Sequence, residues 1–386
     1  MPSASPLEPR VRGRLAALEA AGLMRSLRPP SGIDLSSNDY LGLARHPLIG
    51  QRAIAALERD GCGSTGSRLL RGDRDVFQAL ERRFASFKAA ERSLYFGSGY
   101  LANLAVLSTL PERGDVIFSD ALNHASLIDG MRLSRATTVV FPHNDVRALA
   151  DLLAASDAHV RFIVVESLFS MEGDLAPLDE YARLCGETGA VLVVDEAHAV
   201  GVYGARGTGV LEARAVSHAG CISINTAGKA LGVAGAFVAG PDWAVEYLMQ
   251  RARPFVFTTA PPPAFADALE ASLDLIEQEP QRRERLLELA ARCRRTLTER
   301  GITILPGTSQ IVPVLIGDNE RAVHVAAALQ RKGFDVRAIR PPSVPPGTAR
   351  LRVSVNADLP DEQIDRFAEV LASALKEAPV CAAVSS

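Results

Sequence analysis

Short apolar runs alternate with longer amphipathic stretches from about residue 73 onward. The stretch from Asp75 to about Ala89 has its apolar residues at helical spacing, and a compact apolar run follows at residues 92–96. Period and length together predict a helix and then a buried strand. Four more compact apolar runs are predicted to be strands: 115–119, 137–141, 161–166 and 191–194. This alternation predicts an α/β fold with a mostly parallel, seven-stranded type of sheet that carries helices on both faces.

The order of elements changes after about residue 264. Helices are predicted over 264–277, 281–300, 320–332 and 360–376, and strands near 302–305, 311–316, 334–338 and 351–355. This order is typical of a small α+β domain. Residues 251–263 end in three prolines and predict an extended segment before a long helix.

The N-terminal part is predicted to be separate from both domains. Apolar residues at helical spacing predict an amphipathic helix over 11–28, and a short strand that breaks into a polar turn is predicted over 35–43. We therefore expect an N-terminal helix and arm over 1–45, a large domain over 46–275 and a small domain over 276–386, with a loose tail from about Ala378.

Composition excludes several classes of function. Of the 386 residues 47% are hydrophobic and 23% are charged, and the net charge of −3 gives no basic excess for nucleic acid. No apolar run predicts a signal peptide or a membrane span, so we expect a cytoplasmic protein without a membrane partner. Five scattered cysteines predict free thiols in a reducing compartment and no metal site: Cys62, Cys185, Cys221, Cys293 and Cys381.

Lys229 stands alone in a run of small and apolar residues, 221–240. An ammonium in apolar surroundings loses hydration, so its pKa falls and the neutral amine can attack a carbonyl. The small residues leave room for a flat ring, and the hydroxyl of Thr226 could hold a phosphate. A surface lysine in a connecting loop is the alternative from this stretch alone.

Asp195 and His198 follow a run of four apolar residues, 191–194. This order places Asp195 at the carboxyl end of a buried strand, where an acid needs a cationic partner. A helicase also has Asp-Glu-Ala-His after such a strand, but it requires a Gly-x-x-x-x-Gly-Lys-Ser/Thr loop, which this chain lacks.

Three other predicted turns lead to the same sheet edge. The turn Gly97-Ser-Gly-Tyr100 precedes a helix, so the amides of Gly99 and Tyr100 could bind a phosphate. His124 follows the next predicted strand and could also be a helix cap or a core histidine, and Ser170 follows a later strand. One ligand, pyridoxal phosphate (PLP), would use all these groups: a lysine for its aldehyde, an acid for its ring nitrogen and a helix N-terminus for its phosphate.

Seven stretches in order resemble the α-oxoamine synthases, a family of fold-type I PLP enzymes: 37–43, 98–103, 123–126, 169–174, 195–198, 226–229 and 349–354. The resemblance extends from about Arg14 to Glu377. It implies that Lys229 forms a Schiff base with PLP and later acts as acid and base. It also implies that Asp195 pairs with the ring nitrogen, that His198 and Ser170 bond the phenolic oxygen, and that His124 stacks on the ring.

The same resemblance implies a phosphate site and a second subunit. Thr226 and the amides of Gly99 and Tyr100 would hold the phosphate. Members of the family are homodimers with shared active sites, so Thr258 or Thr259 would complete the phosphate site of the partner.

Substrate residues are also implied by the resemblance. Arg352 would bind the amino-acid carboxylate, with Asn38 and Ser343 nearby, and Arg25 would contact the acyl substrate. Arg350 shares a strand face with Arg352, so the sequence leaves open which of the two reaches the ligand.

The implied reaction joins an amino acid to an acyl thioester with loss of carbon dioxide. L-alanine and a pimeloyl thioester of coenzyme A or acyl carrier protein are the expected substrates. Glycine or serine with another acyl group, an aminotransferase, and a non-catalytic subunit remain alternatives. The chain departs from the family pattern at Ala199 and within the segments 63–71 and 355–359. The last two segments help to shape the acyl pocket in the family, so the resemblance defines the substrate less firmly than the reaction.

Overall fold

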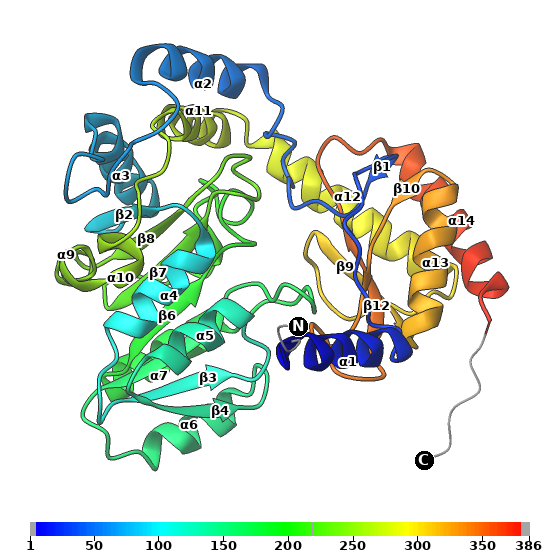
Figure 1. Ribbon diagram of the computed structural model, residues 1–386, viewed down its shortest axis with the longest axis horizontal. Coiled ribbons are helices and arrows are strands. Elements are labelled where there is room, and N and C mark those ends of the chain that lie inside the picture. Colours follow the sequence, from blue (N-terminus) through cyan, green and yellow to red (C-terminus); the bar gives the residue numbers. More distant parts are fainter. Residues whose placement is uncertain (1–4, 218, 380–386) are drawn as a thin grey trace.

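The computed structural model describes residues 5–217 and 219–379. Figure 1 shows a large lobe built on a seven-stranded sheet and a small lobe built on a three-stranded sheet, joined through the consecutive helices α11 (Ala264–Gln278) and α12 (Gln281–Glu299). Cys381 and the expected tail beyond Pro379 lie outside the described residues. The domain bounds predicted from the sequence stay a prediction, and α11 runs across the one at residue 275.

The large sheet is mostly parallel, as the sequence predicts. Its strand order is β2-β8-β7-β6-β5-β3-β4, and every neighbouring pair is parallel except the two pairs that include β8. The strands are β2 (Arg92–Phe96), β3 (Val116–Asp120), β4 (Thr137–Phe141), β5 (Arg161–Glu166), β6 (Val191–Asp195), β7 (Cys221–Thr226) and β8 (Ala236–Gly240).

Helices bury both faces of this sheet. Val164 and Val193 belong to an apolar cluster on one face, whereas their neighbours Val165 and Val194 belong to a cluster on the other. Side chains alternate along a strand, so burial of both faces requires the uninterrupted apolar runs seen in the sequence. The first face carries α4 (Gly99–Thr109), α5 (Ala125–Leu133), α9 (Asp242–Arg251) and α10 (Arg253–Val256), and the second carries α6 (Val146–Ala154), α7 (Leu178–Thr188) and α8 (Val210–Ala213).

The small lobe is an antiparallel sheet covered by helices. Its strands β9 (Ile311–Gly317), β11 (Ala338–Ile339) and β12 (Ala349–Ser354) stand in the order β11-β12-β9. Two helices, α13 (Asn319–Arg331) and α14 (Asp361–Glu377), pack with α12 around it. Two further helices, α2 (Pro47–Asp60) and α3 (Asp75–Lys88), pack on α11 above the large sheet.

Residues 21–40, here called the N-terminal arm, are attached to the small lobe. Strand β1 (Ile33–Asp34) pairs in parallel with β10 (Phe334–Asp335). The backbone carbonyl groups of Leu35 and Tyr40 accept hydrogen bonds of 2.8 Å from Ser354 and Ala357. The arm therefore places its residues beside β12, far from them in sequence.

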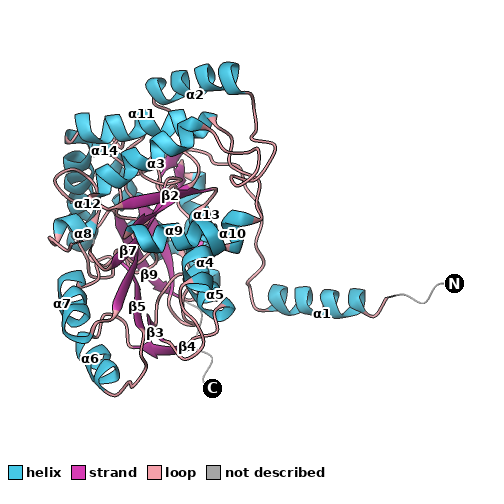
Figure 2. Cartoon of the chain, turned by 90° about the vertical axis from the view of Figure 1, so that its left-hand side faces the viewer, coloured by secondary structure: helices cyan, strands magenta, loops and turns pink. Residues whose placement is uncertain are grey.

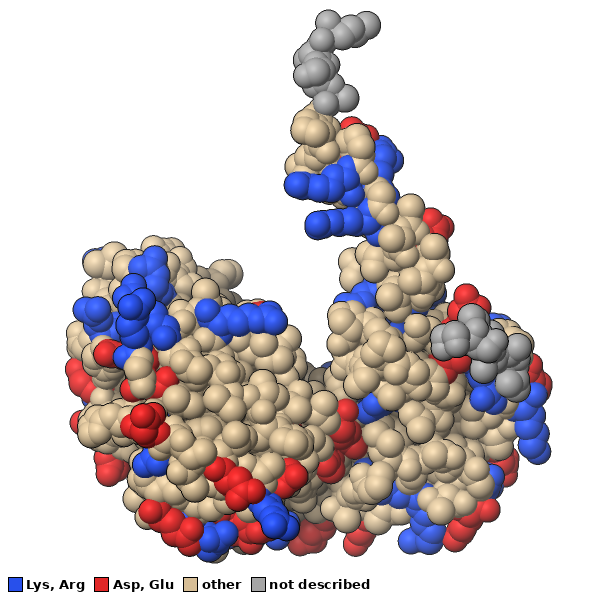
Figure 3. All heavy atoms as spheres, turned by 90° about the horizontal axis from the view of Figure 1, so that it is seen from below, with Lys and Arg blue, Asp and Glu red and all other residues tan. Residues whose placement is uncertain are grey.

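Helix α1 (Leu7–Ala20) projects from the body of the molecule (Figure 2). None of its residues is buried. Seen from below in Figure 3, the two lobes border a hollow, and basic side chains lie along the projecting helix beside it. Within the described residues no helix is long and apolar enough to cross a bilayer.

Four sequence predictions of local structure are wrong. The short strand predicted from residue 35 lies earlier, as the two-residue β1, and residues 35–43 form bends and turns. The N-terminal helix ends at Ala20 instead of residue 28, because Gly22 takes a positive φ of 64° that interrupts it. Residues 302–305 form a single bridge, Ile304 to Val314, where a strand was predicted. The supposedly extended segment 251–263 contains the short helix α10, whose Pro254 is compatible with a first helical turn.

Candidate active site

Three strands of the large sheet end at one edge. Strand β5 ends at Glu166, β6 at Asp195 and β7 at Thr226. In the register of the sheet Glu166 lies beside Asp195, and Asp195 lies beside Ile224. Because parallel strands finish at the same edge, the turns that follow them converge there.

Lys229 lies half-buried in the turn after β7. Its Nζ atom is 2.8 Å from Nε2 of His198. Burial lowers the pKa of Lys229 to about 8, against the opposing attraction of Asp195 and Glu166. At this pKa about a tenth of the lysine is a neutral amine at pH 7, far more than for an ordinary lysine, and the neutral amine is the nucleophile.

His198 connects Lys229 to the arm. Its Nδ1 atom lies 2.6 Å from the hydroxyl of Tyr40, which is fully buried. Burial, and then the charge of Lys229, lowers the pKa of His198 well below its usual value, so the ring is neutral. A neutral imidazole has one N–H and one lone pair. The Tyr40 hydroxyl donates to Oδ1 of Asn38 at 3.0 Å, so the N–H at Nδ1 of His198 donates to the Tyr40 oxygen and Nε2 turns its lone pair towards Lys229.

Asp195 is held by neutral donors. Its Oδ2 atom accepts a hydrogen bond of 2.7 Å from Asn103, and its Oδ1 atom accepts one of 2.8 Å from the amide of Ala197. Among the described residues no lysine, arginine or histidine forms an ion pair with it. The neighbouring Glu196, by contrast, pairs with buried Lys88. Asp195 is thus the acid of this turn that can still take a cation.

The donors to Asp195 also fix His124. Asn103 bonds Ser126 at 2.8 Å, and the Ser126 hydroxyl lies 2.7 Å from Nδ1 of His124. The same ring nitrogen accepts the amide of Ser126 and caps α5. His124 is therefore a helix cap, one of the two structural alternatives considered for it, and these hydrogen bonds fix its ring although the residue is exposed.

Gly99 and Thr226 form a close cradle at the start of α4. A Cβ atom on Gly99 would come within 2.3 Å of Oγ1 of Thr226. Ser98 caps the helix through the amide of Leu101, so its side chain does not occupy the amides of Gly99 and Tyr100. These two amides at a helix N-terminus, together with a hydroxyl, can bind a phosphate.

Arg350 and Arg352 are both buried on β12 but differ in their partners. Arg350 pairs with Glu172 at 3.1 Å. Within the described residues Arg352 bonds only neutral acceptors: the carbonyl of Ser170, and the side chains of Asn38, Tyr40 and Ser354, at 2.6 to 3.2 Å. A buried guanidinium without a carboxylate can accept one from a ligand.

The other predicted residues lie at several depths. Ser170 is buried beside Arg352, to which it offers its backbone carbonyl. Arg25 and Ser343 are exposed and line one pocket of the small lobe. Thr258 and Thr259 follow α10 at the surface, and in the part of the chain that the structure describes neither side chain makes a hydrogen bond.

Sequence reasoning assigned no role to Tyr40, Asn103 or Glu166. Tyr40 and Asn103 fall within the stretches that resemble the family, and Glu166 ends a predicted strand, so position was the available signal. Glu166 is fully buried and one of its oxygens has no partner. Burial, and then the charge of Asp195, raises the pKa of Glu166 well above its usual value.

Known proteins share the sequence and the fold. The sequence pattern of aminotransferase class I and II matches residues 30–371. An 8-amino-7-oxononanoate synthase from Anaeromyxobacter dehalogenans strain 2CP-1 is 47% identical over 383 residues, 96% of either chain.

Two solved structures show the same fold. A serine palmitoyltransferase variant from S. paucimobilis, with a bound PLP–myriocin aldimine, has a TM-score of 0.89 at 30% identity over 97% of this chain and 99% of that one. An 8-amino-7-oxononanoate synthase from Francisella tularensis has a TM-score of 0.79 at 30% identity over 90% and 98% of the two chains. The fold is common to both activities, so the higher sequence identity of the A. dehalogenans relative is the more discriminating finding.

Proposed function

The chain belongs to the aminotransferase class I and II family, and from this membership and its site we propose that it joins L-alanine to a pimeloyl thioester. A bond forms between Cα of alanine and the thioester carbonyl carbon, and the thiol leaves. The bond from Cα to the alanine carboxylate breaks and releases carbon dioxide. The product is 8-amino-7-oxononanoate, the compound after which the relatives are named, on the route to biotin.

One linked set of side chains carries the proposal. Arg352, without a carboxylate partner, bonds Tyr40, Tyr40 bonds His198, and His198 reaches Lys229. The set brings a receptor for a carboxylate and a nucleophilic amine into one buried network. An amino acid has the two matching groups, a carboxylate and an amine.

The residues of the site fit PLP. The cradle of Gly99 and Thr226 matches a phosphate, Asp195 matches the ring nitrogen, and Lys229 matches the aldehyde. When bound, PLP supplies an aldehyde that combines with amines and a ring that accepts the electron pair of a breaking Cα bond. His198 and Ser170 are proposed to bond its phenolic oxygen, and His124 to stack on its ring.

Lys229 is proposed to move the proton at Cα. A base is most effective when its pKa lies near the working pH, and burial brings the pKa of Lys229 to about 8. The lone pair at Nε2 of His198 faces Nζ and holds the amine in place by accepting a hydrogen bond from one of its N–H groups. Arg352 fixes the carboxylate of alanine, with Asn38 beside it, and thereby orients Cα.

The acyl substrate is proposed to enter from the small lobe, where Arg25 and Ser343 line one pocket. A second copy of the chain is proposed to complete the site through Thr258 or Thr259. Exposed apolar residues support such a homodimer, because Phe257 beside these threonines is 73% exposed and Leu7 and Val11 of α1 are 51% and 43% exposed. A cytoplasmic location stays a prediction from the sequence.

The test supplies the purified protein with PLP and pimeloyl-coenzyme A, and compares L-alanine, glycine and L-serine. We expect carbon dioxide, free thiol and a product with the mass of 8-amino-7-oxononanoate, from alanine only. The Lys229→Ala variant serves as the control and should lose turnover by at least about 10³-fold. Preference for serine or glycine, a keto acid without thiol release, or a protein that does not retain PLP would each contradict the proposal.

A further inference from the structure

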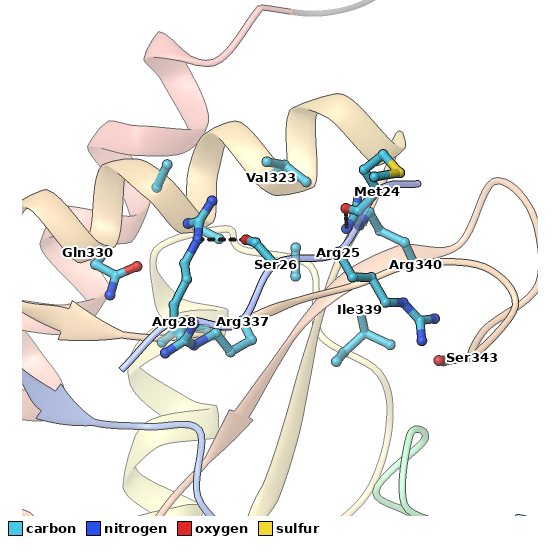
Figure 4. A pocket seen from close by; sticks show the side chains of 14 residues that line it. Met24, Arg25, Ser26, Arg28, Val323, Gln330, Arg337, Ile339, Arg340 and Ser343 are labelled. Atoms are coloured by element: carbon cyan, nitrogen blue, oxygen red, sulfur yellow. Dashed lines mark hydrogen bonds between the residues drawn. The ribbon is translucent and has the colours of Figure 1, made fainter. Parts of the chain in front are cut away.

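A pocket of about 420 Å³ lies between the N-terminal arm and the small lobe. Figure 4 shows Arg25 and Arg28 on the arm, with Arg337 and Arg340 on the strand region that faces them. Among the residues that the structure describes, no aspartate or glutamate lines the pocket. We call it the arginine pocket.

Most of its positive charge is not neutralised. Arg337 forms a two-point ion pair with Asp335, at 2.7 and 3.0 Å. Arg340 donates only to the backbone carbonyls of Gly22 and Met24, and Arg28 donates to the hydroxyl of Ser26 at 3.2 Å. Within residues 5–217 and 219–379, three of the four arginines thus have no carboxylate partner.

The remainder of the lining is largely apolar. Val323, Ala326 and Ala327 come from α13, and Ile339 comes from β11. Figure 4 shows Val323 and Ile339 on either side of the arm residues. A ligand that suits this lining combines strong negative charge with an uncharged organic part.

The arginine pocket is one strand away from the proposed carboxylate site. Its strand β11 pairs with β12, with Ala338 opposite Leu351, and the amide of Arg352 donates to the carbonyl of Arg337 at 3.4 Å. Neighbouring strands are about 4.8 Å apart. The arginine pocket and the proposed carboxylate site therefore lie on neighbouring strands of one sheet.

We propose that the arginine pocket binds the phosphate of the phosphopantetheine that carries the acyl thioester. The inference rests on the proposed function, which requires such a thioester. A single pimeloyl carboxylate needs one guanidinium, which Arg25 can supply, so Arg28 and Arg340 are left for a more highly charged group. Guanidinium groups bind phosphate through paired, charge-assisted hydrogen bonds. The apolar wall receives the uncharged part of the carrier.

The test measures equilibrium binding of carriers without an acyl group to the PLP-loaded protein. The probes are pantetheine, 4′-phosphopantetheine, coenzyme A and the phosphopantetheine form of acyl carrier protein. The test variant is Arg28→Gln, which lies outside the proposed catalytic set. The matched control is Arg147→Gln, because Arg147 is also exposed but lies on α6 of the large lobe.

We expect phosphopantetheine to bind more tightly than pantetheine, with an affinity that falls as salt is added. Arg28→Gln should weaken binding of the phosphorylated probes roughly tenfold and leave pantetheine unchanged. Arg147→Gln should bind like the unaltered protein. Equal binding of pantetheine and phosphopantetheine, or unchanged binding by Arg28→Gln, would overturn the inference.

The probes also identify the source of the phosphate. If coenzyme A binds more tightly than phosphopantetheine, the inference is supported and coenzyme A is the carrier. If the phosphopantetheine form of acyl carrier protein binds more tightly, and Arg28→Gln weakens this binding, the inference is supported and acyl carrier protein is the carrier. These binding measurements do not need turnover. If the carriers bind in a way that depends on Arg28 but the protein does not condense alanine, only the proposed function is rejected. Turnover with an unchanged thioester KM in Arg28→Gln would reject only the arginine pocket.

Discussion

The Nζ atom of Lys229 lies 2.8 Å from Nε2 of His198, whose other ring nitrogen lies 2.6 Å from the hydroxyl of Tyr40. This relationship links the lysine of the large lobe to a residue of the N-terminal arm. Tyr40 in turn accepts a hydrogen bond of 3.2 Å from Arg352 of the small lobe. The state of the amine is therefore coupled to residues of both lobes.

The Tyr40→Phe variant tests this coupling. It removes the partner of Nδ1 of His198 and one acceptor of Arg352, so we expect kcat to fall about tenfold and the KM for alanine to rise. Without the Tyr40 oxygen, the N–H at Nδ1 of His198 loses its acceptor, and the charged form of the ring loses a hydrogen bond. The pKa of His198 should fall, and the acid limb of the pH profile should move to lower pH.

Tyr181→Phe is the matched control for Tyr40→Phe. Tyr181 is also fully buried, but its hydroxyl has no hydrogen-bond partner in the described part of the chain. We expect kinetics and pH profile like those of the unaltered protein. If Tyr40→Phe behaves in the same way, Tyr40 only fills space.

The pKa of Lys229 gives a pH dependence that can be measured on the protein freed of PLP. Only the neutral amine reacts with an aldehyde, so the rate of PLP attachment should rise with pH and level off above about 8. An ordinary lysine would keep gaining rate up to about 10.5. Stopped-flow absorbance after addition of PLP measures the rate, with Lys229→Ala as the blank.

The lowered pKa of Lys229 also makes the free energy of unfolding depend on pH. The unfolded chain keeps the proton on this lysine up to about pH 10.5, whereas the folded chain releases it at about 8. The unfolded state thus binds more protons between these values, and the contribution of Lys229 to the free energy of unfolding rises with pH across that window. If the rate of PLP attachment levels off only near pH 10.5, burial does not lower the pKa of Lys229.

Much of the site could be predicted from sequence because local order determines it. The apolar run before Asp195 requires a buried strand, and parallel strands bring their carboxyl ends to one edge. The mostly parallel sheet was predictable for the same reason. Strand β7, which precedes Lys229, was not among the predicted strands, because Ser223 and Asn225 interrupt its apolar residues.

The choice between Arg350 and Arg352 could not be predicted in this way. The two residues share a strand face, and the difference arises from Glu172, almost 180 positions earlier in the chain, which neutralises only Arg350. Tyr40 was missed for a similar reason. Its position depends on the long-range pairing of β1 with β10, which no local pattern reveals.

Arg352→Gln and Arg350→Gln form a matched pair that decides which arginine binds the amino acid. Loss of Arg352 should raise the KM for alanine roughly 100-fold, because a charge-assisted pair with the carboxylate is lost. Loss of Arg350 should leave that KM nearly unchanged. It should instead lower the melting temperature, because Glu172 is left without its partner.

Steady-state kinetics and thermal melting of both variants provide the measurement. A large rise in the alanine KM for Arg350→Gln, with little change for Arg352→Gln, would reverse the assignment. Equal effects in both variants would show that the small lobe, and not one guanidinium, governs binding.

The cradle at the start of α4 predicts a specific effect of one methyl group. In Gly99→Ala the new Cβ atom would come within 2.3 Å of Oγ1 of Thr226, so the hydroxyl has to move away from the proposed phosphate position. Loss of a well-placed hydrogen bond to a charged group weakens binding roughly 10- to 100-fold, and we expect that loss in PLP affinity. Equilibrium dialysis of PLP measures it directly.

Gly186→Ala is the control for this change, because Gly186 lies inside α7 with open space around its Cβ position. Alanine favours a helix by about 1 kcal/mol over glycine, so this variant should be slightly more stable and bind PLP normally. Thr226→Ala removes the hydroxyl without introducing a clash. It therefore separates the loss of the hydroxyl from the steric effect of the methyl group in Gly99→Ala. If Thr226→Ala and Gly99→Ala weaken PLP binding by similar factors, displacement of the hydroxyl accounts for the weaker binding of Gly99→Ala. If Gly99→Ala binds PLP normally, the phosphate does not bind at this cradle.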